Sequence, residues 1–242
     1  QSSTTFIYDT SPTSCSISTV SWGSYLNATE DDEDGTVTVV TNGVENGQTV
    51  TVGLNGANYT GSVSSGSVTI TIPGANLRAL SEGTTHTITA DVSDLAGNEA
   101  PQASTTFIYD KTAPTVDSVV INPSTLTTDA SGATVEITFS ESIQSAPTLN
   151  APNATMSSLS TSDDIVWTGS LTADPNTDVS NNTLTISNYT DDAGNSGATD
   201  TSTTYIIDTL GPIVTVTQIG ENHYGNIFAT SDSTPDLVFS SN

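Results

Sequence analysis

Three copies of one short phrase divide this chain at intervals of about one hundred residues. The copies read "FIYDTSP", "FIYDKTAP" and "YIIDTLGP", and in each an aspartate is followed closely by a proline. They begin at Phe6, Phe107 and Tyr205, so the steps are 101 and 98 residues. A repeat of this length has the size of a small domain and not of a solenoid unit. The sequence therefore predicts a string of similar domains.

A second phrase keeps the same spacing and fixes the boundaries. "DLAGN" at 94–98 precedes the second copy and "DDAGN" at 191–195 precedes the third. We expect each domain to close with this phrase, a final strand, an aspartate and a proline, and the chain to be part of a longer array. The predicted divisions are the last strand of a preceding domain at 1–9, complete domains at 10–110 and 111–208, and the start of another at 209–242.

Short alternating runs indicate strands throughout both complete domains. The first domain has them at 14–22, 36–40, 49–54, 67–72, 86–92 and 104–109, and the second repeats the pattern. About seven short strands per hundred residues are typical of an immunoglobulin-like β-sandwich, with an eight-stranded jelly roll as the alternative. The predicted fold class is all-β, with tandem sandwiches joined by short proline-containing linkers. Residues 42–48 are expected to form a hairpin turn, and 73–83 a helix of one or two turns.

The charge of the chain excludes several classes of partner. The chain has 27 acidic and two basic residues, and its net charge is −25. Nucleic acids and anionic membrane surfaces bind through lysine and arginine, so neither is an expected partner. No apolar run approaches the roughly 20 residues that cross a bilayer, so no membrane insertion is expected. The single cysteine, Cys15, gives no internal disulfide.

No catalytic activity is predicted. The two histidines, His86 and His223, lie in no recognisable catalytic motif. The acidic residues recur with the domain period, as structural devices do and a single active site does not.

Several stretches resemble a known family of repeats. "YLNATEDDEDGTVTVVTNG", "TAPTVDSVVI" and "SDSTPDLVFSS" are similar to tandem bacterial immunoglobulin-like repeats of giant surface adhesins and biofilm-associated proteins. The resemblance implies an extracellular arm at the cell surface, stiffened by calcium, that holds a distant binding domain away from the cell. Its partners would be neighbouring domains of the same chain.

The closing aspartates are the strongest candidates for calcium ligands. The final strand should carry each of them to the end of its domain that faces the next one, away from the "AGN" loop of the same domain. Converging carboxylates repel unless a cation lies between them, and Ca²⁺ accepts six to eight oxygen ligands in flexible geometry. We therefore predict junction ions held by Asp9, Asp110 and Asp208, although each could instead cap a strand before its proline.

Three further sets of residues are candidates, each with a plainer alternative. In "EDDEDG" the candidates are Glu30, Asp32 and Asp34, but Thr41 replaces the last ligand of an EF-hand, so a looser calcium loop and a solvated acidic turn both remain open. In "DPNTD" the alternative is a plain turn, and in the two "AGN" phrases it is a turn with glycine at positive φ. The candidates in these phrases are Asp174, Asn176, Asp178, Asp94, Asn98, Asp191, Asp192 and Asn195.

Three functions are consistent with these features. The first is a non-catalytic extender segment of a secreted adhesin, with calcium stiffening its junctions. The second is a subunit of an extracellular filament or surface layer, in which copies of the chain exchange strands. The third is an immunoglobulin-like module that binds a glycan or a protein partner through its end loops.

Overall fold

The computed structural model describes residues 8–212 in full and the backbone of 214–219, 222–224, 227–229 and 237–241. Most of the strand expected at 1–9 lies outside these residues. The chain divides into two compact units. Unit 1 contains Gln1–Thr115, Glu141–Ser145 and Asn188–Ala198, and unit 2 contains Val116–Ser140, Ala146–Ser187 and Thr199–Asn242.

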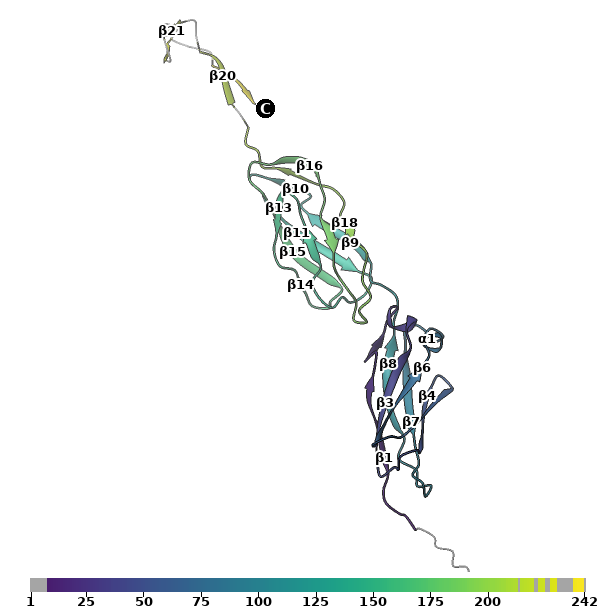
Figure 1. Ribbon diagram of the computed structural model, residues 1–242. Helices are drawn as coiled ribbons and strands as arrows, with labels where there is room; N and C mark the ends of the chain where they lie inside the picture. Colours follow the sequence, from purple (N-terminus) through teal and green to yellow (C-terminus); the bar gives the residue numbers. More distant parts are fainter. Residues whose placement is uncertain (1–7, 213, 220–221, 225–226, 230–236, 242) are drawn as a thin grey trace, which may run out of the picture. The chain divides into compact units, whose positions relative to one another are not determined.

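Unit 1 is a sandwich of two sheets (Figure 1). One sheet has the order β1-β3-β6 and the other the order β2-β8-β7-β4-β5. Its strands are β1 Ser14–Val20, β2 Tyr25–Leu26, β3 Gly35–Asn42, β4 Thr49–Leu54, β5 Ala57–Ser62, β6 Ser67–Ile72, β7 Thr84–Asp91 and β8 Ala103–Tyr109. A 3₁₀ turn, η1 Glu30–Asp32, and the single-turn helix α1 Gly74–Leu77 complete it. The expected short helix at 73–83 is therefore confirmed.

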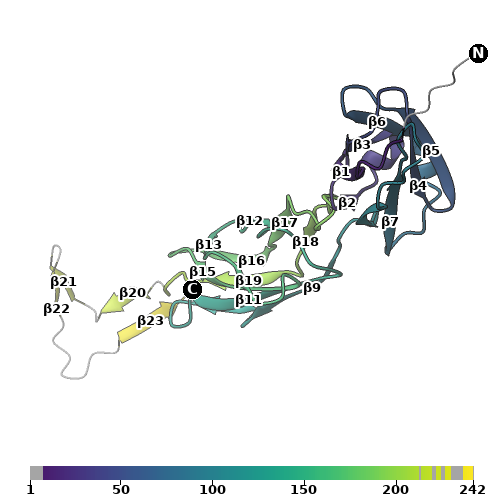
Figure 2. The same ribbon diagram turned by 90° about the horizontal axis from the view of Figure 1, so that it is seen from below.

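Unit 2 is also built from strands, and Figure 2 shows β16 and β19 side by side in it. Its sheets have the orders β13-β15-β11-β9, with β14 also paired to β15, then β12-β17-β18 and β10-β19-β16. The strands are β9 Val116–Asn122, β10 Thr125–Thr127, β11 Gly132–Phe139, β12 Thr148–Asn150, β13 Ala154–Met156, β14 Ser160–Thr161, β15 Val166–Ala173, β16 Asp178–Asn182, β17 Thr185–Ser187, β18 Asp200–Thr201 and β19 Tyr205–Asp208.

The remaining described residues form two strand pairs. β20 Val214–Ile219 pairs with β23 Leu237–Ser241, and β21 Asn222–Tyr224 pairs with β22 Ile227–Ala229. The all-β prediction is thus confirmed along the described chain. Assigning 209–242 to a following domain remains a prediction.

Both units begin with the same change of sheet. In unit 1, β1 pairs with β3, and the chain then places β2 parallel to β8 in the other sheet. In unit 2, β9 pairs with β11, and β10 then runs parallel to β19. Leu26 on β2 and Leu126 on β10 are fully buried at matching positions. The repeat in the sequence is therefore a repeat of topology.

The alternation of the strands places their valines and isoleucines between the sheets. Val37 and Val39 of β3 are fully buried, as are Val50 and Val52 of β4. Burial of such side chains is the main stabilising contribution in a sandwich of this size. Trp22 packs edge-on against Phe107, with ring centroids 5.3 Å apart.

The prediction of a hairpin turn at 42–48 is wrong. β3 pairs with β1 and β6, whereas β4 pairs with β5 and β7, so the connection crosses from one sheet to the other. The buried faces of β3 and β4 both belong to the core, and this burial decides the pairing in place of the turn residues. The hairpin between β4 and β5 instead turns at Asn55 and Gly56, which have φ of 49° and 78°.

Candidate functional site

The two "AGN" phrases fold into the same turn. In the first, Asp94 accepts the backbone N–H of Asn98 at 2.8 Å and its side-chain amide at 2.7 Å. In the second, Asp191 accepts both groups of Asn195 at 2.8 Å. Gly97 and Gly194 have φ of 91° and 90°, a conformation that glycine adopts without strain. The turn that was the plainer alternative for these phrases is therefore present, and calcium binding by their residues remains a prediction.

Each turn is also bonded to a closing aspartate. The side-chain amide of Asn98 donates to the carbonyl of Asp9 at 3.1 Å, and that of Asn195 donates to the carbonyl of Asp110 at 2.9 Å. The closing aspartates bend the chain in the same way, because Asp9 accepts the N–H of Ser11 and Asp110 that of Thr112. Each turn therefore contacts the closing aspartate of the repeat before it. This agrees with the expectation that the "AGN" turn and the closing aspartate of one repeat lie at opposite ends of the domain.

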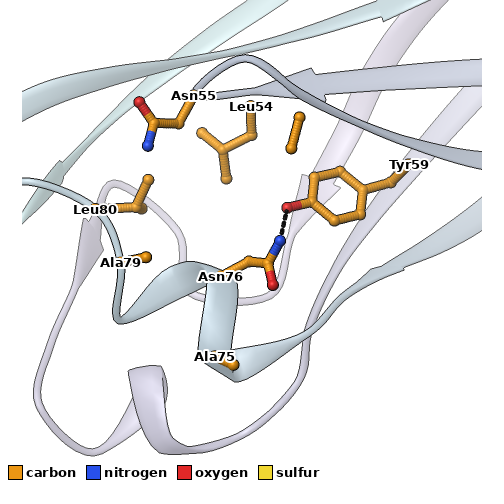
Figure 3. Close-up of a pocket in the computed structure, with 8 residues that line it drawn as sticks. Leu54, Asn55, Tyr59, Ala75, Asn76, Ala79 and Leu80 are labelled. Atoms are coloured by element: carbon orange, nitrogen blue, oxygen red, sulfur yellow. Dashed lines mark hydrogen bonds between the residues drawn. The ribbon is translucent and has the colours of Figure 1, made fainter.

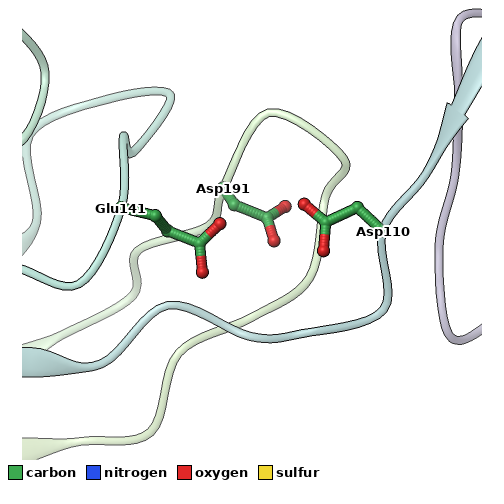
Figure 4. Close-up of side chains that lie close together, drawn as sticks. All are labelled: Asp110, Glu141 and Asp191. Atoms are coloured by element: carbon green, nitrogen blue, oxygen red, sulfur yellow. The ribbon is translucent and has the colours of Figure 1, made fainter. Parts of the chain in front are cut away.

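Three carboxylates converge beside the second turn (Figure 4). One oxygen each of Asp110, Glu141 and Asp191 lies within 4.8 Å of the others. Asp110 follows β8, Glu141 follows β11, and Asp191 opens the turn after β17, so the three come from separate segments of unit 1. Asp191 is 1% exposed, and the other two are half-buried. Among the described residues this is the one such group of three acidic, histidine or cysteine side chains.

Burial and repulsion between carboxylates disfavour the charged forms of Asp110 and Glu141. Burial is the largest cause of the raised pKa of Asp110, and the carboxylates of Asp191 and Glu82 raise it further. The hydrogen bond from the backbone N–H of Thr112 lowers it. Burial and the neighbouring Asp110, Asp191 and Asp192 raise the pKa of Glu141. Two unit charges 4.8 Å apart repel by about 3 kcal/mol at an effective dielectric of 20, and less where water screens them.

Neither the lysine nor the arginine of the chain forms an ion pair with the cluster. The sequence has only two lysine and arginine residues. Arg78 pairs with Asp32 at 3.0 Å, and Lys111 lies 3.9 Å from Glu82. A cation from solution is the remaining source of positive charge. Oxygen ligands without histidine or cysteine fit Ca²⁺ and do not fit zinc.

Acidic side chains at 30–34 form hydrogen bonds and an ion pair with other residues of unit 1. Glu30 accepts the N–H of Asn27 at 3.1 Å, Asp32 pairs with Arg78, and Asp34 accepts the N–H of Gly74 at 3.0 Å. Asp31, the buried member, accepts the hydroxyl of Tyr109. The structure does not bring Glu30, Asp32 and Asp34 together into a cluster of three carboxylates.

The candidates at 174–178 lie in unit 2 with the third closing aspartate. Asn176 occupies a turn with φ of 57°, and Asp178 on β16 stands opposite Asp208 on β19. The carbonyl of Asp174 accepts the hydroxyl of Thr209 at 2.7 Å. Asp178 and Asp208 are therefore neighbours, and no third carboxylate joins them in the described part of the chain.

The remaining predicted residues lie beside the turns. Asp192 is exposed, accepts the hydroxyl of Ser142 at 3.2 Å and acts electrostatically on Glu141. Asp94 is buried, and its hydrogen bonds with Asn98 lower its pKa. Glu45 approaches the first turn but accepts the N–H of Leu95 at 2.9 Å.

Glu141 is the cluster member that the sequence did not reveal. It lies in "FSESI", outside both repeated phrases. The available signal was its place two residues after a long alternating strand, where a loop at the end of the sandwich begins. Counting 97 residues back, the spacing of the two "AGN" phrases, gives Val44, so the repeat itself does not mark the position.

A separate hollow of about 230 Å³ lies between the β4–β5 turn and α1 (Figure 3). Its floor includes Leu54 and Leu80, and the side-chain amide of Asn76 donates to the hydroxyl of Tyr59 at 2.7 Å across its rim. No acidic or basic side chain lines it. The hollow therefore has the chemistry of a neutral surface depression and is unrelated to the carboxylate cluster.

No helix in the described part of the chain is both long and apolar enough to span a membrane. Among curated proteins, none matches the chain.

Three of the solved structures similar to the chain come from bacterial adhesins. A structure concerned with host-cell surface retention of a 1.5-MDa bacterial ice-binding adhesin is 21% identical, with 90% of this chain and 71% of that chain covered and a TM-score of 0.52. A Ca²⁺-stabilized adhesin that helps an Antarctic bacterium bind ice is 21% identical, with 90% and 54% covered and a TM-score of 0.47. A bacterial immunoglobulin-like domain of the M. primoryensis ice-binding adhesin is 27% identical, with 40% and 96% covered and a TM-score of 0.33.

A family model agrees with the fold. The model described as "Bacterial Ig-like domain" matches residues 110–207, the stretch from the second closing aspartate almost to the third. The first of the three structures shares the fold over most of this chain. Residues 110–207 therefore match a bacterial Ig-like domain, within a chain that shares its fold with part of a bacterial adhesin.

Proposed function

We propose that this chain is a non-catalytic structural segment of a large secreted adhesin at the cell surface, with calcium bound by Asp110, Glu141 and Asp191. The observation that carries the proposal is the convergence of three carboxylates, one of them 1% exposed, with no basic side chain among them. The adhesin role and the extracellular location rest on the resemblance of the repeats. The partners are neighbouring domains of the same chain.

Calcium fits the cluster for reasons of charge and geometry. The ion removes the repulsion between the carboxylates and accepts ligands at irregular angles, as expected where three separate segments each supply one group. Carboxylates supply two oxygens each, and nearby carbonyls and water complete a shell of six to eight ligands.

Calcium binding would stiffen the arm by restraining the chain segments that connect the two units. Residues Glu141–Ser145 and Asn188–Ala198 belong to unit 1, but each is continuous at both ends with residues of unit 2. An ion that ties Glu141 and Asp191 to Asp110 opposes departure of these segments from unit 1. We further propose ions of the same kind at Asp9 with Asp94, and at Asp208, with ligands from the neighbouring domain.

Small-angle X-ray scattering of the whole chain tests the stiffening. For the wild type, CaCl₂ after EDTA is expected to give a narrower distribution of particle dimensions and a larger mean radius of gyration. Asp110→Asn should lose most of this response. Asp117→Asn, which removes one exposed carboxylate from β9, should keep it. A wild type without a calcium response, or an Asp110→Asn variant with the full response, would refute the proposal.

A further inference from the structure

Asn27 bonds the loop that carries Asp191 without using any metal ligand. Its side-chain amide donates to the carbonyl of Ala193 at 2.9 Å. The next residue, Ala28, donates its backbone N–H to the side-chain oxygen of Asn195 at 3.3 Å. These residues all belong to unit 1, and Asn27 is half-buried. The segment 188–198 is thus held by neutral hydrogen bonds on one side and by the carboxylate cluster on the other.

The local structure around Asn27 fixes the direction of its amide. Its side-chain oxygen accepts the N–H groups of Thr29 and Glu30 at 2.9 and 3.0 Å, and its own N–H donates to the Glu30 carboxylate at 3.1 Å. This reciprocal arrangement resembles a helix capping box and leads into η1. With the oxygen held on the turn, the NH₂ group points away from the turn, toward Ala193.

The second repeat carries a different residue at the same place. Leu26 pairs with β8 as Leu126 pairs with β19. The residues that follow these leucines, Asn27 and Thr127, therefore occupy corresponding positions. The Thr127 hydroxyl accepts the N–H of Ala130 at 3.2 Å and so serves the same turn. A threonine side chain ends one bond nearer the backbone and carries no NH₂ group. The turn is therefore repeated, but the donor toward a neighbouring loop is particular to Asn27.

We infer that Asn27 is a positioning residue for the calcium site: its amide holds the segment 188–198 so that Asp191 faces Asp110 before any ion binds. The inference rests on the proposed calcium site for its consequence, but the hydrogen bonds of Asn27 and Ala28 involve none of the three carboxylates. Ordering a ligand in advance lowers the free-energy cost of binding. These hydrogen bonds, called the latch below, also oppose the repulsion between the carboxylates, which would otherwise drive the segment 188–198 away from Asp110 in calcium-free protein.

Amide hydrogen exchange and calcium titration of the whole chain test this role together. Asn27→Thr keeps the turn acceptor, as Thr127 does, and removes the NH₂ donor. In EDTA, the variant should exchange the amides of 188–198 about two- to tenfold faster than the wild type, because one hydrogen bond is lost. Its calcium dissociation constant should rise by a similar factor. Asn58→Thr, at an exposed position of β5, should change neither quantity.

A second variant keeps the test decisive. Asn27→Asp retains the side-chain oxygen that accepts the backbone N–H of Glu30, and aspartate suits the start of a turn. It also replaces the NH₂ donor with an oxygen, which would face the carbonyl oxygen of Ala193. It should raise exchange at 188–198 more than Asn27→Thr does. Unchanged exchange in both variants would overturn the latch. Faster exchange with unchanged calcium affinity would overturn the positioning role. Failure of the wild type to bind calcium would refute the calcium site, while the exchange result in EDTA would still decide the latch.

Discussion

In the proposed calcium site, Asp191 has two tasks. Its two oxygens accept the backbone and side-chain N–H groups of Asn195, which fixes the turn. An ionised carboxylate has about four acceptor positions, so two remain for a cation. Asp94 makes the same bonds in the first turn, where Glu45 is held by Leu95. The same turn thus stands beside a third carboxylate in one repeat and lacks one in the other.

Part of this site was predictable from single residues. The closing aspartates and the "AGN" residues repeat with the domain period, so Asp110, Asp191 and Asn195 were identifiable. Glu141 was not, because the repeat offers no acidic counterpart at Val44. The roles of Asp32 and Asp34 were also beyond the sequence, because they depend on Arg78 and Gly74, which are 46 and 40 residues away.

The raised pKa values of Asp110 and Glu141 predict how stability depends on pH. From their ordinary values of 3.8 and 4.5 upward, the folded state holds protons that the unfolded state has released. Without calcium, the free energy of unfolding should therefore fall as the pH rises through this window. With calcium the trend should reverse, because the ligands must be deprotonated to bind.

Urea denaturation at a series of pH values, in EDTA and in CaCl₂, checks this dependence. The double variant Asp110→Asn/Glu141→Gln isolates the cluster from the general repulsion of a chain with net charge −25. Subtracting its stability from that of the wild type should leave the predicted slope. A flat difference between pH 4 and 7 in EDTA would contradict it. Asp94 acts in a separate window, because its lowered pKa gives stability that is lost only as the pH falls below 3.8.

At the scale of elements, the long strands were predictable and the short ones were not. β4 and β6 match their expected bounds, because strict alternation places buried side chains on one face. β2, β10 and β18 have two or three residues, too few to show a period. β5 was missed because its sequence, "ANYTGS", follows no clear hydrophobic alternation and forms a strand by pairing with β4. The error at 42–48 has the same origin, since pairing depends on the core.

The turns at 94–98 and 191–195 allow a matched prediction. Gly97→Ala and Gly194→Ala place a Cβ at the same positive φ, which costs about 1–2 kcal/mol of folding free energy. Gly194→Ala should also weaken calcium binding several-fold, because the turn that it strains carries Asp191. Gly97→Ala should leave the affinity of the Asp110 cluster unchanged. Urea denaturation and calcium titration of both variants provide the test, and equal loss of affinity in the two would contradict it.

The whole molecule repeats a topology but not every contact. Both units start with a strand that leaves one sheet for the other. Both sequence repeats contain the turn that opens with aspartate, although the two turns belong to unit 1. They differ in the third carboxylate, in the donor at position 27 and in the helix α1. The sequence period therefore predicts the architecture, and the departures from it lie at the proposed calcium site and at Asn27, the residue proposed to position it.

Calcium binding would also explain how so acidic a chain stays folded. An ion that binds the folded state alone stabilises it by about 2.7 kcal/mol when free calcium is one hundred times the dissociation constant. That amount is a substantial part of the stability of an ordinary domain. The same ion would restrain the segments that link unit 1 to unit 2 along the chain.

Isothermal titration of calcium into metal-free protein tests the central claim most directly. The wild type should bind one more calcium ion than Asp110→Asn/Glu141→Gln, and only the ions that remain should raise the thermal midpoint of the variant. The control Asp117→Asn/Glu136→Gln, which removes two exposed carboxylates from β9 and β11, should keep the wild-type stoichiometry. Equal stoichiometry and affinity in the wild type and in Asp110→Asn/Glu141→Gln would show that the three carboxylates hold no calcium, and the account would fail.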